Sequence, residues 1–305
     1  MPGRPDIPVA FRGLYDSPLV SVREYRCHAC GGGPGPEEAS DANTLVLMRH
    51  GAFCRHFGRS HATADVNQAV FFSKGSTYRV SHPVDGGDRG TVFAVAPRVL
   101  QDIIRELDPT VDDRPEQLFP FVSGPCESTV FWRHRELVRR LEAGAEALEP
   151  FWVDVTALQI VADTLEAAFA QQGHPRRRRR EGTEADHTAL AEAAKSHLAA
   201  RLGERLTLDE VAQAVHASPF HFARVFQQRT GISIHRYLTL LRLRASLERL
   251  AGGEEDLTVL ALDLGFSSHS HFADAFRKEF GRTPSEVRKN ASLRTLHQMS
   301  KNLEV

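Results

Sequence analysis

A pattern that occurs twice near the C-terminus constrains the fold of this chain more than any other feature. Residues 221–226 read HFARVF, residues 271–276 read HFADAF, and a glycine stands five residues after each copy. Each copy follows a short amphipathic segment, residues 208–215 and 259–264, and a break in the apolar pattern. A helix, a tight turn and a capped helix, repeated at a spacing of 50 residues, predict two helix-turn-helix units.

The second helix of such a unit enters the major groove of DNA, and its N-terminal residues meet base edges. Serines stand at the N-cap positions of both helices, and phenylalanines four residues apart are expected to anchor each helix in the core. We therefore expect DNA contacts from these side chains: Ser218, Phe220, His221, Ala223 and Arg224 in the first unit, and Ser268, His269, Ser270, Asp274 and Arg277 in the second. The alternative is a helical bundle that has a duplicated core motif and does not bind DNA.

The second copy resembles the signature of the AraC/XylS family of bacterial transcription regulators. The resemblance rests on residues 265–268 (GFSS), Phe272, Phe276, residues 280–281 (FG) and residues 283–284 (TP). It covers roughly residues 187–290 and implies a seven-helix domain in which a long helix, residues 234–250, joins the two units. It also implies double-stranded DNA as a partner, with RNA polymerase as a second one.

Asp274 is a departure from the family pattern, because family members often carry a basic or amide side chain at this place. Arg224 occupies the matching position in the first copy. Phosphates repel an aspartate, which can accept only from the amino group of cytosine or adenine. We therefore expect the first unit to read bases and the second mainly to position the domain.

The charge of the chain gives DNA binding little general support. The net charge is −1, and residues 187–290 hold 14 Lys and Arg against 12 Asp and Glu. Non-specific affinity comes from neutralised phosphates, so we expect it to be modest. The local positive charge is expected from arginines clustered in and after the first unit: Arg224, Arg229, Arg236, Arg242 and Arg244.

The first 97 residues have a different pattern, in which short apolar or alternating runs are separated by Gly, Pro and Asp. We predict strands at residues 20–26, 44–50, 70–72, 78–81 and 91–96, which favours a small barrel or sandwich. The family resemblance implies a cupin-like sensor barrel here, although the region has no clear cupin metal signature. The predicted fold class is therefore α+β, with an all-α domain at the C-terminus.

Residues 98–172 are predicted to be helical and to complete an N-terminal sensor and dimerisation domain, residues 1–172. Helices are expected at residues 98–107 and 129–148. Apolar residues from Phe151 to Phe169 then alternate at spacings of four and three, which is an a/d seam. The seam either packs inside the domain or forms a homodimer interface, and the family resemblance favours the dimer.

The remaining boundaries follow from composition. Residues 173–186 contain five consecutive arginines and are predicted to be a basic linker, because blocks of like charge repel and stay extended. The linker is either solvated or touches the DNA backbone beside the specific site. The DNA-binding domain is expected at residues 187–290 and a tail at 291–305.

The cysteines suggest a second kind of site. Cys27 and Cys30 form a C-x-x-C pair, which can clamp a soft metal such as zinc or form a disulfide. Further ligands would have to be Cys54 together with a nearby histidine: His28, His50 or His56. Ordinary reduced cysteines, a metal site and a thiol redox switch all stay open. Residues 82–88 have the composition of turns.

These features predict a DNA-binding transcription regulator, not an enzyme, that responds to a small-molecule or metal effector. One alternative is a cupin-like metalloenzyme fused to a DNA-binding domain, which needs two or three converging histidine or carboxylate ligands. Another is a metal or thiol redox sensor that regulates transcription. The sequence has no apolar run of about 18 residues and no segment of signal-peptide form, so we expect a cytoplasmic protein.

Overall fold

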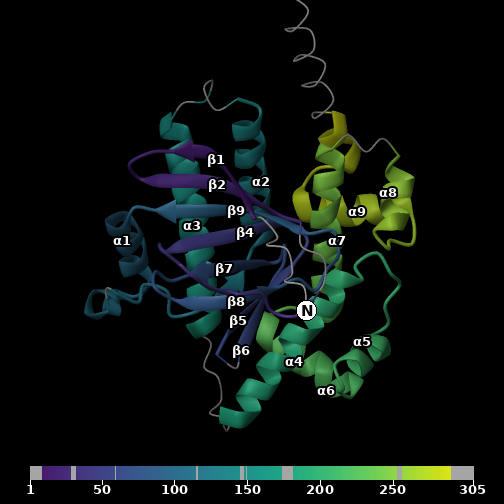
Figure 1. Cartoon of the computed structure of the whole chain (residues 1–305). Helices are drawn as coiled ribbons and strands as arrows, with labels where there is room; N and C mark the ends of the chain where they lie inside the picture. The colour runs from purple at the N-terminus through teal and green to yellow at the C-terminus, as the bar shows by residue number, and fades with distance from the viewer. Residues whose placement is uncertain are drawn as a thin grey trace, which may run out of the picture.

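The computed structural model describes residues 9–28, 32–58, 60–114, 116–144, 148, 150–173, 181–252 and 256–289. The fold is α+β, as predicted. Two antiparallel sheets and three helices come first, and helices make up the rest (Figure 1). No helix in these ranges is long and apolar enough to cross a lipid bilayer.

The larger sheet has the strand order β1-β2-β9-β4-β7-β10. Its strands are β1 (Ala10–Asp16), β2 (Val20–Cys27), β4 (Thr44–His50), β7 (Gln68–Phe72), β9 (Asp88–Val95) and β10 (Ser123–Pro125). Buried and partly exposed residues alternate along β9, which is the pattern of a strand with one face on the core. β7 is buried along its whole length because it lies inside the sheet, between β4 and β10.

The smaller sheet has the order β3-β8-β5-β6. Its strands are β3 (Glu37–Ala39), β5 (Phe53–Phe57), β6 (Ser60–Ala64) and β8 (Thr77–Ser81). Among the described residues the two ladders remain separate, so the predicted small barrel or sandwich consists of two antiparallel sheets that do not close into one ring. The five predicted strands correspond to β2, β4, β7, β8 and β9. The other five were not predicted.

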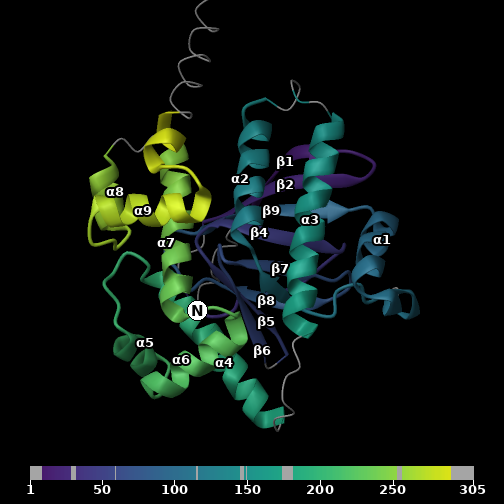
Figure 2. The same ribbon diagram turned by 180° about the vertical axis from the view of Figure 1, so that it is seen from behind.

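Two helices, α2 (Ser128–Glu142) and α3 (Pro150–Gly173), cover one face of the larger sheet, and a third, α1 (Pro97–Leu107), lies beside the ends of its strands (Figure 2). α1 was predicted, whereas α2 ends six residues earlier than expected, near Gly144, whose φ is 135°. The predicted loop between α1 and α2 also holds a short 3-10 helix, Pro109–Asp113, and the edge strand β10.

The apolar seam on α3 does not coincide with the face that the helix buries. The buried side chains include Val153, Ile160 and Val161, whereas Phe151 is 72% exposed and Val155 49% exposed. The C-terminal end of the seam is internal, because Leu165 is fully buried and the ring of Phe169 packs on Phe121. The seam thus packs inside the domain at one end and faces solvent at the other.

The C-terminal helices are α4 (Glu181–Ala200), α5 (Leu208–Ala214), α6 (Pro219–Thr230), α7 (Ile234–Ala251), α8 (Leu257–Asp263) and α9 (His269–Phe280). A further helical turn begins at Pro284. The predicted long joining helix is α7. The predicted linker must be corrected at its C-terminal end, because α4 already begins at Glu181; the arginine run, residues 176–180, lies outside the described residues.

The N-terminal half, which comprises the two sheets and α1 to α3, shares one hydrophobic core with the C-terminal half, which comprises α4 to α9. A single cluster of buried side chains runs from the sheets through α2 and α3 into α4 to α9. α4 packs on β6 and α7 packs on β4. Two of the C-terminal helices, α4 and α7, therefore pack directly against the sheets, and the C-terminal helices are not a separate domain joined only by a linker.

Candidate DNA-binding surface and the pocket beside it

The first helix-turn-helix unit is built from α5 and α6. A reciprocal capping box starts α5: Thr207 Oγ1 accepts from Glu210 N, and the Glu210 carboxylate accepts from Thr207 N. The turn is closed by a hydrogen bond from Ala217 N to Ala212 O, and His216 adopts a left-handed φ of 54°. Ser218 takes the predicted N-cap position of α6, although its side chain makes no capping hydrogen bond.

The second unit repeats this geometry with α8 and α9. Phe266 N donates to Ala261 O, which matches the closing bond of the first turn. Gly265 has a φ of 77°, and a Cβ there would lie 2.6 Å from a guanidinium nitrogen of Arg242, so this turn needs glycine. Ser268 caps α9 by accepting from the backbone of His271 at 3.1 Å.

The phenylalanine pairs are the core anchors that the sequence predicts. Phe222, Phe226, Phe272 and Phe276 are all fully buried. Each pair packs edge to face, with ring centroids 5.9 Å apart in α6 and 5.6 Å apart in α9. Both second helices are thus fixed by one face, and their opposite faces are left for other contacts.

The predicted DNA contacts fall largely on these opposite faces. Ser218 and Arg224 are exposed in the first unit, and Ser268, Ser270, Asp274 and Arg277 are exposed in the second, while Ala223 and His269 are partly exposed. The side chain of Phe220 lies outside what the structure describes. Asp274 makes no ion pair with Arg277 or Lys278 in the described part of the chain.

His221 is placed differently from the other predicted contacts. Its ring packs on the ring of His187 in α4, with centroids 5.4 Å apart. The side chain of His221 is therefore turned toward α4, and its first role is to hold α6 on that helix.

The arginine cluster also needs a correction, because most of its members are engaged inside the protein. Arg244 is fully buried and donates to Val66 O and Cys126 O at 2.6 and 2.7 Å. The other engaged members bind local acceptors: Arg229 binds Glu184, Arg236 binds Glu279, and Arg242 binds Leu202 O and Glu204 O. Spacing along the chain cannot reveal these partners, since several come from other elements.

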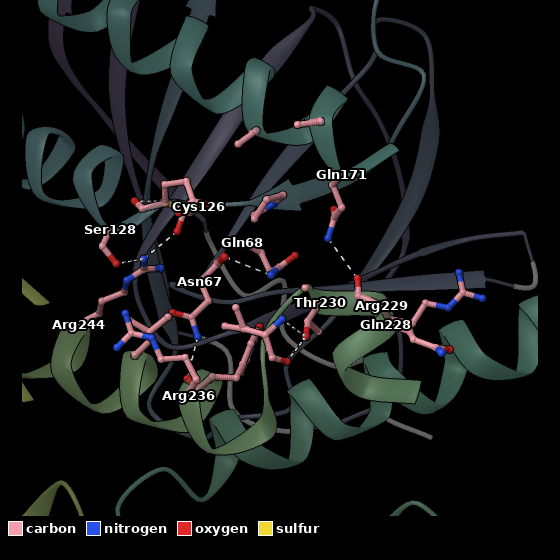
Figure 3. Close-up of a pocket in the computed structure, with 18 of the residues that line it drawn as sticks. Asn67, Gln68, Cys126, Ser128, Gln171, Gln228, Arg229, Thr230, Arg236 and Arg244 are labelled. Atoms are coloured by element: carbon pink, nitrogen blue, oxygen red, sulfur yellow. Dashed lines mark hydrogen bonds between the residues drawn. The ribbon is translucent and has the colours of Figure 1, made fainter. Parts of the chain in front are cut away.

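Arg224 borders a pocket between the two halves of the molecule. The pocket has a volume of about 770 Å³ and is lined by residues at one edge of the larger sheet, by α2, α3 and α4, and by α6 and α7. Figure 3 shows the sheet residues facing the arginines of α6 and α7 across it. Its polar lining includes Asn67, Gln68, Gln171, Arg224, Gln228 and Arg236. Gln171 of α3 donates to Arg229 O at 3.1 Å and closes one side.

The floor of this junction is a buried polar network that joins the halves. Asp65, which follows β6, accepts from the Tyr237 hydroxyl at 2.5 Å, and Asn67 donates to Tyr237 O at 3.0 Å. Burial raises the pKa of Asp65 to about 6, although the Tyr237 hydrogen bond and the charge of Lys195 act in the opposite direction. Burial also raises the pKa of the pocket thiol Cys126 to about 11, so this thiol stays protonated at neutral pH.

The predicted metal ligands do not converge. Cys54 lies against Thr63 and Ser196, because β5 faces α4 at this point, and burial raises the pKa of its thiol. His56 contacts Ser81 at 2.7 Å and the ring of His61, while His28 is exposed. Cys30 lies outside the described residues. Of the predicted ligands that the structure describes, only Cys27 belongs to a converging group, in which it lies beside His82 and Asp88.

Comparisons with known proteins agree with the helical geometry. Residues 211–290 match a helix-turn-helix domain family. An HTH-type transcriptional regulator of Haemophilus influenzae is 33% identical over 86 residues, 28% of this chain and 29% of that protein. The chain thus spans less than a third of that regulator. The HTH-type transcriptional activator RhaS of an Enterobacter species is 25% identical over 263 residues, 85% of this chain and 90% of RhaS. An apo structure of a ToxT variant from Vibrio cholerae covers 90% of this chain and 98% of its own, at 11% identity and a TM-score of 0.39.

Proposed function

We propose that this chain, which belongs to the AraC/XylS family of transcription regulators, binds a specific operator through α6 and α9 and changes its affinity when a ligand binds its N-terminal half. The observation that carries the proposal is the pair of helix-turn-helix units, each with one face buried by phenylalanines and the other exposed. Two such units on one body suit successive major grooves, about one helical turn or ~34 Å apart.

The first unit is proposed as the main reader. Arg224 is an exposed cation on α6, and a bidentate arginine–guanine contact gives about 1–3 kcal/mol of discrimination. The second unit presents Asp274 at the matching place, together with Ser268, Ser270 and Arg277, which suit contacts to the backbone and a few base edges.

The pocket at the junction is the proposed link between effector and operator. It is lined by Asn67 and Cys126 from the N-terminal half and by Arg224 and Gln228 from α6. A small molecule bound there contacts both halves, and it competes with DNA for Arg224 or reorients that side chain. Binding of ligand and operator is then thermodynamically coupled, in either direction.

Dimerisation, contact with RNA polymerase and a cytoplasmic location complete the proposal. The exposed end of the α3 seam supports a homodimer, because Phe151 and Val155 present large apolar side chains to solvent on one helix. A dimer would present four helix-turn-helix units to a repeated operator.

The enzyme alternative remains the second candidate, because Cys27, His82 and Asp88 meet beside a cavity. Asp88 contacts His82 Nδ1 at 2.7 Å and so serves the ring, which leaves one histidine beside a cysteine, whereas a cupin-type dioxygenase or isomerase needs two or three histidine or carboxylate ligands around an open position. The regulator is therefore the better supported proposal.

The test is a comparison of Arg224→Ala with wild type on an operator selected from random duplex DNA. Fluorescence anisotropy should show a loss of roughly tenfold or more on the selected operator and a smaller loss on random DNA. Arg98→Ala is the matched control, because Arg98 is an exposed arginine on α1, far from α6 in both views (Figures 1 and 2). Equal affinities of Arg224→Ala and wild type for both DNAs would overturn the assignment of the first unit.

A further inference from the structure

Among the described residues, one group of metal-binding side chains converges inside the N-terminal half, away from α6 and α9. Its members are Cys27, His82 and Asp88, whose ligand atoms all lie within 4.8 Å of one another. Cys27 ends β2, and Asp88 begins β9 and pairs with it in the ladder. His82 follows β8 of the smaller sheet. The cluster therefore joins the two sheets.

The geometry within the cluster suits a metal ion without rearrangement. His82 Nδ1 lies 2.7 Å from Asp88 Oδ2, which leaves Nε2 facing Cys27 Sγ at 3.7 Å. A carboxylate on one ring nitrogen fixes the ring, so that the other nitrogen can serve as a ligand. Tetrahedral zinc with Zn–S of about 2.3 Å and Zn–N of about 2.0–2.1 Å places the two ligand atoms roughly 3.5 Å apart. The observed separation is close to this value.

Two glycines hold the backbone that carries these side chains. A Cβ on Gly87 would lie 2.1 Å from Cys27 O, and a Cβ on Gly51 would lie 2.4 Å from Gly87 O. Both glycines also have positive φ, 81° and 71°. The turn before Asp88 is thus pressed onto the end of β2, which sets the distance between Cys27 and His82.

The electrostatic setting favours a bound cation. Cys27 is 5% exposed and Asp88 is 4% exposed. Arg89, the next residue, directs its guanidinium to Glu24 and Glu248 instead. Cys27 would bind a metal as the thiolate, and a divalent ion would then provide positive charge at short range to this buried thiolate and to the Asp88–His82 pair.

One side of the cluster opens on a cavity between the sheets. This cavity has a volume of about 410 Å³, and its lining includes Phe11, Tyr25, Phe53, Phe72 and Tyr78 as well as the three cluster residues. An ion held by Cys27 and His82 would keep coordination positions that face this aromatic space. Zinc sites that take a further ligand keep an open position, usually beside three protein ligands, whereas structural sites are closed by four.

We propose that Cys27 Sγ and His82 Nε2 bind a zinc ion, that Asp88 holds the His82 ring in place, and that the remaining coordination positions face the cavity. The ligand class that fits the completed site is a small molecule with an apolar body and one metal-binding donor, such as a carboxylate. The metal site rests on the cluster alone and does not depend on operator binding.

The test uses the full chain, stripped of metal with a chelator and titrated with Co²⁺. We expect one bound ion per chain, with a near-ultraviolet sulfur-to-cobalt charge-transfer band and the intense visible bands of tetrahedral cobalt, both removed by added Zn²⁺. Cys27→Ser should lose the charge-transfer band, and His82→Ala should bind at least 100-fold more weakly. Asp88→Asn should weaken binding by about 10–100-fold, since it acts through His82.

Cys54→Ser is the matched control, because Cys54 is a second buried cysteine of the same half with other contacts. It should keep the band and the stoichiometry. Absence of binding at micromolar Co²⁺ and Zn²⁺, or an unchanged band in Cys27→Ser, would overturn the proposal.

A second measurement on wild type covers the case in which the variants do not fold. Bound Zn²⁺ should slow the alkylation of Cys27 by iodoacetamide at least tenfold, read peptide by peptide in a mass spectrometer, and should leave the rate at Cys54 unchanged. Equal rates at Cys27 with and without Zn²⁺ would also refute the site.

Discussion

The Asp65→Asn variant should be more stable than wild type at neutral pH. This difference in stability should nearly vanish in acid. Asp65 Oδ2 accepts from the Tyr237 hydroxyl, and Oδ1 accepts from Asn67 N at 2.8 Å. In Asp65→Asn the amide oxygen can keep the bond from Asn67, while the amide nitrogen donates to the hydroxyl oxygen. The change therefore removes the charge and keeps the size and the two contacts, with the Tyr237 hydroxyl as acceptor where it was the donor.

The magnitude follows from the difference between the folded and unfolded pKa of the carboxyl group. Burial raises the pKa of Asp65 from 3.8 to about 6. This difference of about two units corresponds to roughly 3 kcal/mol. A raised carboxyl pKa means that the folded state holds the proton more tightly than the unfolded chain. Stability from this group is therefore fully present below about pH 4 and is lost as the pH rises through 6.

The assay is denaturant unfolding of wild type and Asp65→Asn at pH 5 and pH 7. The variant should gain roughly 3 kcal/mol relative to wild type at pH 7 and about half of that at pH 5. Asp113→Asn is the control, because Asp113 is exposed. If the difference in unfolding free energy between Asp65→Asn and wild type is the same at both pH values, the Asp65 carboxyl does not have the raised pKa described above. Confirmation would mean that acid tightens the contact between the two halves.

Two further outcomes are expected. Asp274→Ala should leave operator affinity unchanged or strengthen binding to all DNA sequences alike, because phosphates repel this exposed carboxylate. If anisotropy measurements instead show a large, sequence-selective loss, Asp274 reads a base. Phe151→Glu should convert a dimer of the full chain into a folded monomer, because Phe151 is the most exposed apolar side chain of the α3 seam. A wild type that is already monomeric by light scattering at micromolar concentration would contradict this.

The helix-turn-helix units could be predicted because their signals are local. In each unit a span of fewer than 15 residues holds the serine cap, the glycine after the last turn and two phenylalanines four residues apart. These signals predict where the helix begins and ends and which face it buries. The same locality explains β4 and α7, whose boundaries were predicted to within one residue. The short strands β3 and β10 have three residues each, too few for a period to be read.

The contacts between the halves could not be predicted, because no local pattern encodes them. Asp65 and Tyr237 are 172 positions apart, and Arg244 lies 178 positions from Val66. Arginines beside a DNA-binding motif suggest phosphate contacts, and only the packed structure reveals that Arg244 is buried. Likewise, His82 had the context of a turn, and its approach to Cys27 depends on the pairing of β2 with β9 and on the facing of the two sheets.

The hydrogen bonds of Arg244 also bear on how the chain is made. Its acceptors, the carbonyls of Val66 and Cys126, precede it by 178 and 118 positions. A ribosome adds about 5–20 residues per second, so the sheets leave the exit tunnel on the order of ten seconds before α7 is available. During this interval the pocket at the junction lacks the wall that α6 and α7 supply. A nascent or truncated chain that lacks these helices is therefore not expected to bind a ligand of that pocket, and recognition of such a ligand begins only when translation has passed α7.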